Sequence, residues 1–120
     1  MAEIHIFKSS PDAYEVAPGE VLFSEGEAGD VMFAVVEGEV ELSHQGRVVE
    51  GVAAGGILGE MALIDTEPRS ATATARTAAR VVRIDQKQFT FLVHEHPTFA
   101  LQVMRVMAGR LRRANVTADR

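Results

Sequence analysis

Short apolar runs separated by glycine-rich turns make up the first two thirds of the chain. In residues 39–43, Val40 and Leu42 alternate with Glu39, Glu41 and Ser43, so one face of this segment is expected in a core and the other in water. Alternating runs with regularly spaced turn residues are typical of an all-β sandwich or barrel. The pattern predicts strands at residues 13–17, 20–24, 31–37, 39–43, 47–53, 70–75 and 79–84.

After residue 84 the apolar residues recur at steps of three and four, which indicates helices. Asp85 and Gln88 have the spacing of a capping box, which predicts a helix from residue 85 to about His94. Pro97 is typical of the first turn of a second helix, which is expected to end near residue 113. Residues 114–120 show no period and are predicted to fray. The apolar stripe of the second helix predicts core packing or a dimer interface and comprises Phe99, Ala100, Val103, Met104, Met107 and Leu111.

The composition indicates one small domain that spans residues 1–120. Hydrophobic residues make up 47% and charged residues 24% of the chain, and there is no cysteine. The formal charge of −5 conceals an asymmetry: residues 1–67 contain fourteen acidic and two basic side chains, whereas residues 68–120 contain three acidic and ten basic ones. This distribution excludes the uniformly basic surface of a nucleic-acid-binding protein over most of the chain.

Targeting signals are not apparent in the sequence. The chain begins without the features of a signal peptide, and its apolar runs are too short to span a membrane. The lack of cysteine suits a reducing compartment. We therefore expect a cytoplasmic protein without a membrane segment.

The residues that carry chemistry lie between positions 55 and 75. Gly59 and Glu60 interrupt the strand pattern and predict a short helix whose free amide groups form an anion site. Arg69 follows Pro68 and stands at the head of the strand predicted for residues 70–75. One row of that strand consists of alanines, which leave room for a ligand.

Two segments stand at a characteristic spacing: Gly59-Glu60-Met61-Ala62-Leu63-Ile64 and Pro68-Arg69-Ser70-Ala71-Thr72. Together they resemble the phosphate-binding cassette of cyclic-nucleotide-binding domains, which occur in catabolite-activator-type regulators, kinase regulatory subunits and cyclic-nucleotide-gated channels. The likeness extends to the turns at 18–23 and 25–30 and covers about residues 14–113. It implies a mainly β fold with C-terminal helices: a β-roll (a double-stranded β-helix, jelly-roll-like) over about residues 13–84, a short phosphate-cassette helix, and two C-terminal helices over about 85–113.

The resemblance implies a role for each residue of the cassette. Arg69 would bind the equatorial oxygens of a cyclic phosphate, because a planar guanidinium matches that geometry and stays charged. Glu60 would accept a hydrogen bond from the ribose 2′-OH. Backbone amides near Ala62, with the hydroxyl and amide of Ser70, would complete the anion site. The expected ligand-binding residues are Gly59, Glu60, Met61, Ala62, Arg69, Ser70 and Ala71.

In this family a C-terminal helix often folds over the ligand as a lid. Part of the apolar stripe after Pro97 is therefore a candidate to cover the base, and Arg105 and Arg110 are candidates for lid or base contacts.

Simpler structural roles stay open for the cassette residues. Arg69 would then be a surface side chain paired with Glu67 or Asp65. Glu60 would be a first-turn acid favoured by the helix dipole, and Ser70 an ordinary residue at a strand edge.

Other function classes lack the residues they need. Lys8 and Lys87 do not follow a glycine, so a Walker-type nucleotide loop is absent. A metal-dependent enzyme on a similar barrel needs His-x-His on its strands, but here that pattern occurs only at His94-Glu95-His96, between the two predicted helices. No cysteine or histidine-supported serine indicates a nucleophilic site. We therefore predict neither a metal site nor catalytic residues, and no enzymatic activity.

We expect a sensor that binds cAMP, or else cGMP, and reports occupancy by ligand-induced movement of its C-terminal helices. Ser70 favours cAMP, because cGMP-selective relatives often have Thr at this position. The nucleotide is the ligand, and no cofactor is expected. Other expected partners are a second copy bound through the C-terminal helix, or an effector protein; no DNA-binding module is expected in this chain. The alternative is a degenerate β-roll that serves as a protein-interaction or oligomerisation module without nucleotide.

Overall fold

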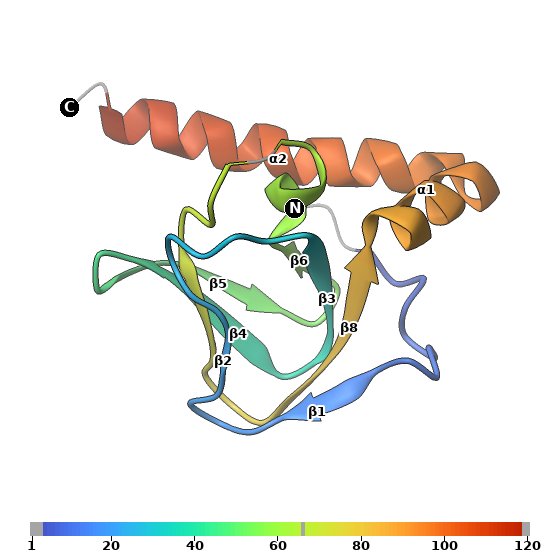
Figure 1. Ribbon diagram of the computed structural model, residues 1–120, viewed down its shortest axis with the longest axis horizontal. Helices are drawn as coiled ribbons and strands as arrows, with labels where there is room; N and C mark the ends of the chain where they lie inside the picture. The colour runs from blue at the N-terminus through green and yellow to red at the C-terminus, as the bar shows by residue number, and fades with distance from the viewer. Residues whose placement is uncertain (1–3, 66, 119–120) are drawn as a thin grey trace.

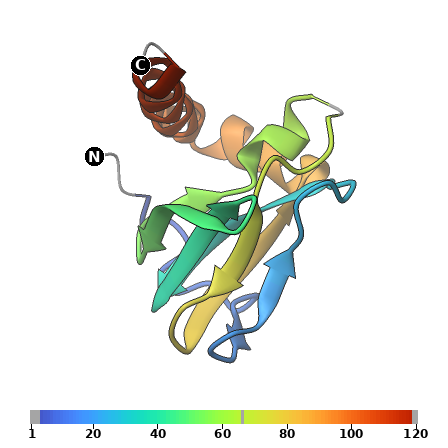
Figure 2. The ribbon, with the colours of Figure 1, turned by 90° about the vertical axis from the view of Figure 1, so that its left-hand side faces the viewer.

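The computed structural model describes residues 4–65 and 67–118 and contains two four-stranded antiparallel sheets that face each other (Figures 1 and 2). One sheet has the strand order β1 (Tyr14–Val16), β8 (Ala79–Asp85), β3 (Val31–Glu37), β6 (Ile57–Leu58). The other has the order β2 (Val21–Phe23), β7 (Thr72–Ala75), β4 (Glu39–His44), β5 (Arg47–Ala53). The predicted β-roll with C-terminal helices is confirmed.

The apolar core forms two clusters on either side of the first sheet, and β3 contributes to both. Val31, Phe33 and Val35 belong to the cluster inside the roll, whereas Met32 and Ala34 belong to the cluster under the helices. Because both faces of β3 are covered, its sequence is a continuous apolar run rather than an alternating one.

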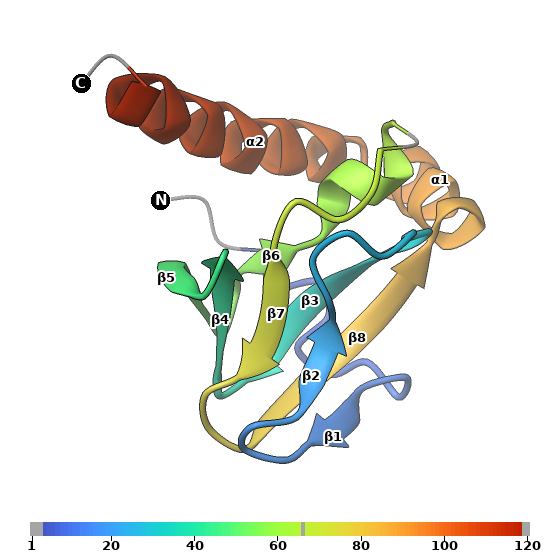
Figure 3. The same ribbon diagram turned by 60° about the vertical axis from the view of Figure 1, so that its left-hand side comes forward.

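Two helices follow β8: α1 (Gln86–Glu95) and α2 (Pro97–Ala118). The predicted capping box is present, because Asp85 Oδ1 accepts a hydrogen bond from Gln88 N and Gln88 Oε1 accepts one from Asp85 N, both at 2.8 Å. The α2 residues Phe99 and Val103 are 0% and 2% exposed and belong to the outer apolar cluster. Helix α2 therefore lies across one end of the roll (Figure 3).

Two predicted boundaries differ from the structure. Helix α2 continues to Ala118 rather than ending near residue 113, because no glycine or proline follows Gly109 and the alanine and arginine residues there favour helix. The last residues of the predicted frayed tail, 119–120, lie outside the described residues. Strand β6 was not predicted, since two residues are too few to show a period; it pairs with Phe33 and Ala34 of β3.

The short helix predicted at Gly59 and Glu60 is present as the 3-10 helix η1 (Glu60–Leu63), directly after β6. Figure 3 shows η1 on the side of the roll that α2 covers. Among the described helices, none is both long and apolar enough to cross a membrane.

Candidate functional site

The site begins at Gly59, where the chain turns from β6 into η1. Gly59 has a φ of 73°, in the left-handed region that favours glycine. A Cβ at this position would lie 2.7 Å from Nη1 of Arg69 and 3.1 Å from the ring of Phe23. Glycine is therefore required here both for the turn and for the close approach of Arg69.

The guanidinium of Arg69 is buried beneath the turn, and the residue is only 8% exposed. Its Nη1 donates to the carbonyl oxygen of Gly59 at 3.1 Å, and its Nη2 donates to that of Val31 at 2.7 Å. The Cζ atom lies 4.1 Å from the centre of the Phe23 ring, which is a cation–π contact. Burial lowers the pKa of Arg69 from its ordinary value, although Asp30 and nearby glutamates oppose this shift.

Within the described part of the chain, the guanidinium of Arg69 has one N–H group without an acceptor and no carboxylate beside its charge. Nε is a buried side-chain nitrogen without a hydrogen-bond partner, and among the described residues no carboxylate lies within ion-pair distance of the guanidinium. The interpretation of Arg69 as a surface side chain paired with Glu67 or Asp65 is therefore wrong. A buried cation in this state is suited to bind an anion.

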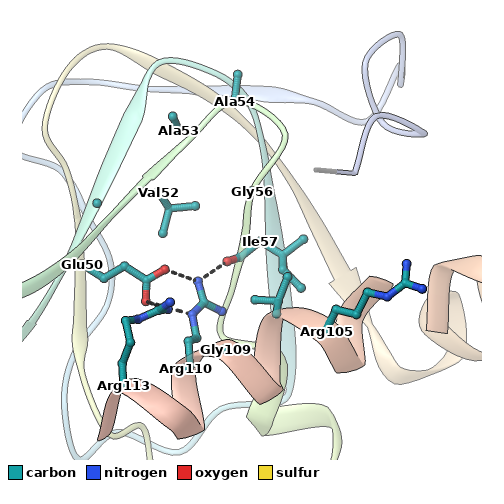
Figure 4. Close-up of a pocket in the computed structure, with 12 residues that line it drawn as sticks. Glu50, Val52, Ala53, Ala54, Gly56, Ile57, Arg105, Gly109, Arg110 and Arg113 are labelled. Carbon is teal, nitrogen blue, oxygen red and sulfur yellow. Dashed lines mark hydrogen bonds and ion pairs between the residues drawn. The ribbon is translucent and has the colours of Figure 1, made fainter. Parts of the chain in front are cut away.

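Glu60 is buried beside this arginine but is paired with a different one. It is 3% exposed, and its Oε1 accepts a hydrogen bond from Nη1 of Arg110 at 2.7 Å. Arg110 also donates to both carboxylate oxygens of Glu50, at 2.9 and 3.0 Å, and to the carbonyl of Ile57 at 2.7 Å. Figure 4 shows the Arg110 side chain reaching from α2 to Glu50 and Ile57.

One guanidinium thus bridges two carboxylates, and we call Arg110, Glu50 and Glu60 the clasp. Burial acts to lower the pKa of Arg110, but the hydrogen bonds and charges of Glu50 and Glu60 outweigh it and the pKa is raised. The clasp joins α2 to β5 and η1, and it gives the buried Glu60 a counter-charge.

Two further cassette residues lie in a groove at the surface. Ser70 and Ala71 line a groove of about 890 Å³ between the second sheet and α2, together with Glu50 and Arg110. Ser70 is exposed. Arg69 is not among the residues that line the groove, and its guanidinium lies against Gly29 and Gly59.

The ligand contacts expected near Ala62 and at Arg105 stay predictions. The amide of Ala62 donates to the carbonyl of Gly59 at 3.3 Å, within the turn of η1, and Met61 is 51% exposed. Arg105 is exposed and lines a cavity of about 390 Å³ between β5 and α2, which shares Glu50 and Arg110 with the groove. Its side chain extends away from the contact of Arg110 with Glu50 (Figure 4).

Several residues of the site were not found from the sequence. Glu50 lies on a half-exposed strand and Phe23 in an apolar run, so neither has a local signal for a ligand site. Gly29 was read only as a turn residue, yet a Cβ there would lie 2.3 Å from Nε of Arg69. Within the described residues, no group of three His, Cys, Asp or Glu side chains is arranged to hold a metal ion.

The sequence of this chain matches one protein family. Residues 14–96 match the model described as "Cyclic nucleotide-binding domain". A CRP-like cAMP-activated global transcriptional regulator of Mycobacterium tuberculosis is 31% identical over 102 residues, which is 81% of this chain and 46% of the regulator. The chain therefore spans about half the length of that relative.

Solved structures give the same result for the fold. The crystal structure of the Thermus thermophilus catabolite activator protein has a TM-score of 0.79 and 28% identity, covering 89% of this chain and 53% of the other. An EAL enzyme in its cGMP-bound form has a TM-score of 0.66 and 30% identity, covering 88% of this chain and 30% of the other.

Proposed function

The chain belongs to the cyclic nucleotide-binding domain family, and on that premise we propose that it is a sensor that binds cAMP in preference to cGMP. It acts as a binding module rather than as an enzyme. Ligand binding changes the position of α2, and this change reports occupancy.

The main support for this proposal is the burial of Arg69 without an anionic partner among the residues that the structure describes. Its guanidinium is a buried cation whose Nε lacks a partner, and no described carboxylate neutralises it by contact. A phosphate diester that accepts the Nε hydrogen would supply both the missing hydrogen bond and the missing counter-charge. Ser70 and Ala71 follow directly in the chain and line the groove, so the sugar and base would occupy the groove.

Glu60 is the proposed partner of the ribose 2′-OH. An acid near a phosphate site also favours a cyclic diester with one negative charge over a 5′-monophosphate with nearly two. We expect Glu60→Gln to weaken cAMP binding about tenfold, while 2′-deoxy-cAMP, which lacks the hydroxyl, is affected little. The measurement is the ratio of the two dissociation constants in each variant. If this ratio is the same in Glu60→Gln and the unaltered chain, Glu60 does not bind the ribose 2′-OH.

The clasp supports the proposed movement of α2. Arg110 of α2 binds Glu60, so any ligand that contacts Glu60 also changes the environment of Arg110. A nucleotide with different affinities for two positions of α2 shifts the population between them.

Two observations favour cAMP over cGMP. Ser70 stands where cGMP-selective members often have Thr, and the Mycobacterium relative is named as cAMP-activated. The EAL enzyme of similar fold binds cGMP, so both nucleotides belong in the test.

Isothermal titration calorimetry with cAMP, cGMP and 5′-AMP tests the proposal. We expect binding of cAMP that is tighter than that of cGMP and 5′-AMP, and its loss in Arg69→Ala. Arg76→Ala is the matched control, because Arg76 is an exposed arginine whose ion pair is with Glu39 at 3.2 Å. Thermal unfolding of each variant separates loss of binding from loss of fold. No binding of either cyclic nucleotide by the unaltered chain would overturn the sensor and leave the interaction module as the alternative.

We also propose that two copies associate through the outer face of α2. Leu101, Met104 and Leu111 are 44%, 55% and 63% exposed, although they stand on the helix that also buries Phe99 and Val103. With Ala108 they repeat at steps of three, four and three residues, which is the spacing of a two-stranded coiled coil.

A further inference from the structure

His44 lies beside the cassette and contacts two residues that are distant from it in the sequence, Glu25 and Ser70. It is the last residue of β4, next to the turn at Gln45 and Gly46, whose φ angles of 51° and 80° are both in the left-handed region. Its Nδ1 lies 2.8 Å from Oε2 of Glu25 and 3.1 Å from the carbonyl oxygen of Ser70. A carboxylate and a carbonyl only accept hydrogen bonds, so Nδ1 carries the hydrogen and shares it between these two acceptors.

Glu25 is itself held in place by both neighbouring segments. Its Oε1 accepts a hydrogen bond from the amide of Gln45 at 2.9 Å, and its own amide donates to Oγ1 of Thr72 at 2.9 Å. The loop between β2 and β3, the turn between β4 and β5, and the start of β7 are therefore joined. This network fixes the His44 ring relative to the backbone of Ser70.

The two peptide planes on either side of Ser70 are thus both fixed. The carbonyl of Arg69, in the plane that carries the Ser70 amide, accepts from Gly26 N at 2.8 Å. The carbonyl of Ser70, in the plane that carries the Ala71 amide, accepts from His44. Because each peptide unit is planar, fixing both planes sets the direction of the Cα–Cβ bond of Ser70 and of both amides.

We propose that His44 is a positioning residue for the anion site: its Nδ1 holds the Ser70 carbonyl, so that the Ser70 hydroxyl and the Ser70 and Ala71 amides are preorganised for the phosphate of the nucleotide. The proposal rests on the proposed nucleotide binding. It adds the last residue of β4 to the site, and this residue acts through Ser70 rather than by touching the ligand. Preorganisation of this kind raises affinity because less freedom is lost on binding.

Three substitutions of His44 separate the hydrogen bond from the rest of the side chain. Asn places an N–H donor near the position of Nδ1, Gln places one near the position of Nε2, and Ala has no donor. With cAMP in calorimetry, we expect His44→Ala and His44→Gln to bind roughly threefold to tenfold more weakly. His44→Asn should bind within about twofold of the unaltered chain. His94→Ala, an exposed histidine at the end of α1, is the matched control and should not change the affinity.

A double-mutant cycle with Ser70→Ala tests whether His44 acts through Ser70. If it does, His44→Ala should cost less affinity in the Ser70→Ala background than in the unaltered chain. Additive losses, or equal affinities of the Asn and Gln variants, would overturn the positioning role while nucleotide binding itself stands. An unaltered chain that binds no cyclic nucleotide would overturn both proposals. The His44 side chain is 53% exposed, and thermal unfolding of each variant measures any effect on the fold.

Discussion

Gly29 determines whether the guanidinium of Arg69 fits under the loop between β2 and β3. A Cβ at Gly29 would lie 2.3 Å from Nε, 2.5 Å from Cζ and 2.8 Å from Nη2 of Arg69, so the guanidinium would have to move. The φ angle of Gly29 is not in the left-handed region, and alanine is compatible with its backbone. We therefore expect Gly29→Ala to weaken cAMP binding by at least about tenfold and to destabilise the fold by about 1–3 kcal/mol.

The control for this prediction is Gly51→Ala on β5. A Cβ at Gly51 would lie 3.8 Å from Oε2 of Glu39, which is an ordinary contact. Calorimetry and thermal unfolding of both variants give the comparison. Equal affinities of Gly29→Ala and the unaltered chain would show that the position of Arg69 in this structure is not needed for binding.

How far the sequence predicted the site depends on distance along the chain. Gly59, Glu60 and Arg69 lie within eleven positions, so the resemblance to a phosphate-binding cassette could be recognised in one short segment. The contacts that Phe23, Gly29 and Val31 make with Arg69 come from a segment about forty residues earlier, and no period or local motif marks them. Arg110 was found only as a lid candidate, because its partner Glu50 lies on a strand where an acidic residue is ordinary.

At the scale of elements, Arg113 pairs with Glu50 at 3.5 Å, and the clasp is a second polar attachment of α2 to the roll. Arg110→Met removes it and leaves Glu60 buried without its counter-charge. The side chains of Arg110 and Glu50 are 19% and 21% exposed, so solvent screens part of the loss and we expect a destabilisation of about 2–3 kcal/mol.

Without nucleotide, hydrogen exchange of the amides in the second half of α2 should become faster in Arg110→Met. Arg105→Met, an exposed arginine on the same helix, is the control. Unchanged exchange in Arg110→Met would mean that the clasp is not needed to hold α2 on the roll.

At the scale of the whole molecule, acidic residues of the first half of the chain form ion pairs with basic residues of the second half. The acid-rich first half forms most of the roll, and the basic second half supplies the arginines that pair with it. Arg76 and Arg80 pair with Glu39 and Glu37 at 3.2 and 3.3 Å, in addition to the clasp. The sign change near Arg69 therefore separates two parts of one structure that attract each other, and the helix that carries Arg110 belongs to the basic part.

The outer face of α2 gives the last prediction. If two copies pair through Leu101, Met104, Ala108 and Leu111, burial of each large side chain contributes roughly 1.5–3 kcal/mol. Light scattering should then give twice the chain mass of 13.0 kDa, and Met104→Glu with Leu111→Glu should give the monomer mass. Phe91→Glu on α1 is the control, because Phe91 is equally exposed at 63% but lies on another helix. Since the same helix carries Arg110, linkage requires that cAMP change the dimer affinity by the factor by which dimerisation changes the cAMP affinity. A monomeric unaltered chain at high concentration, with and without cAMP, would contradict the paired arrangement.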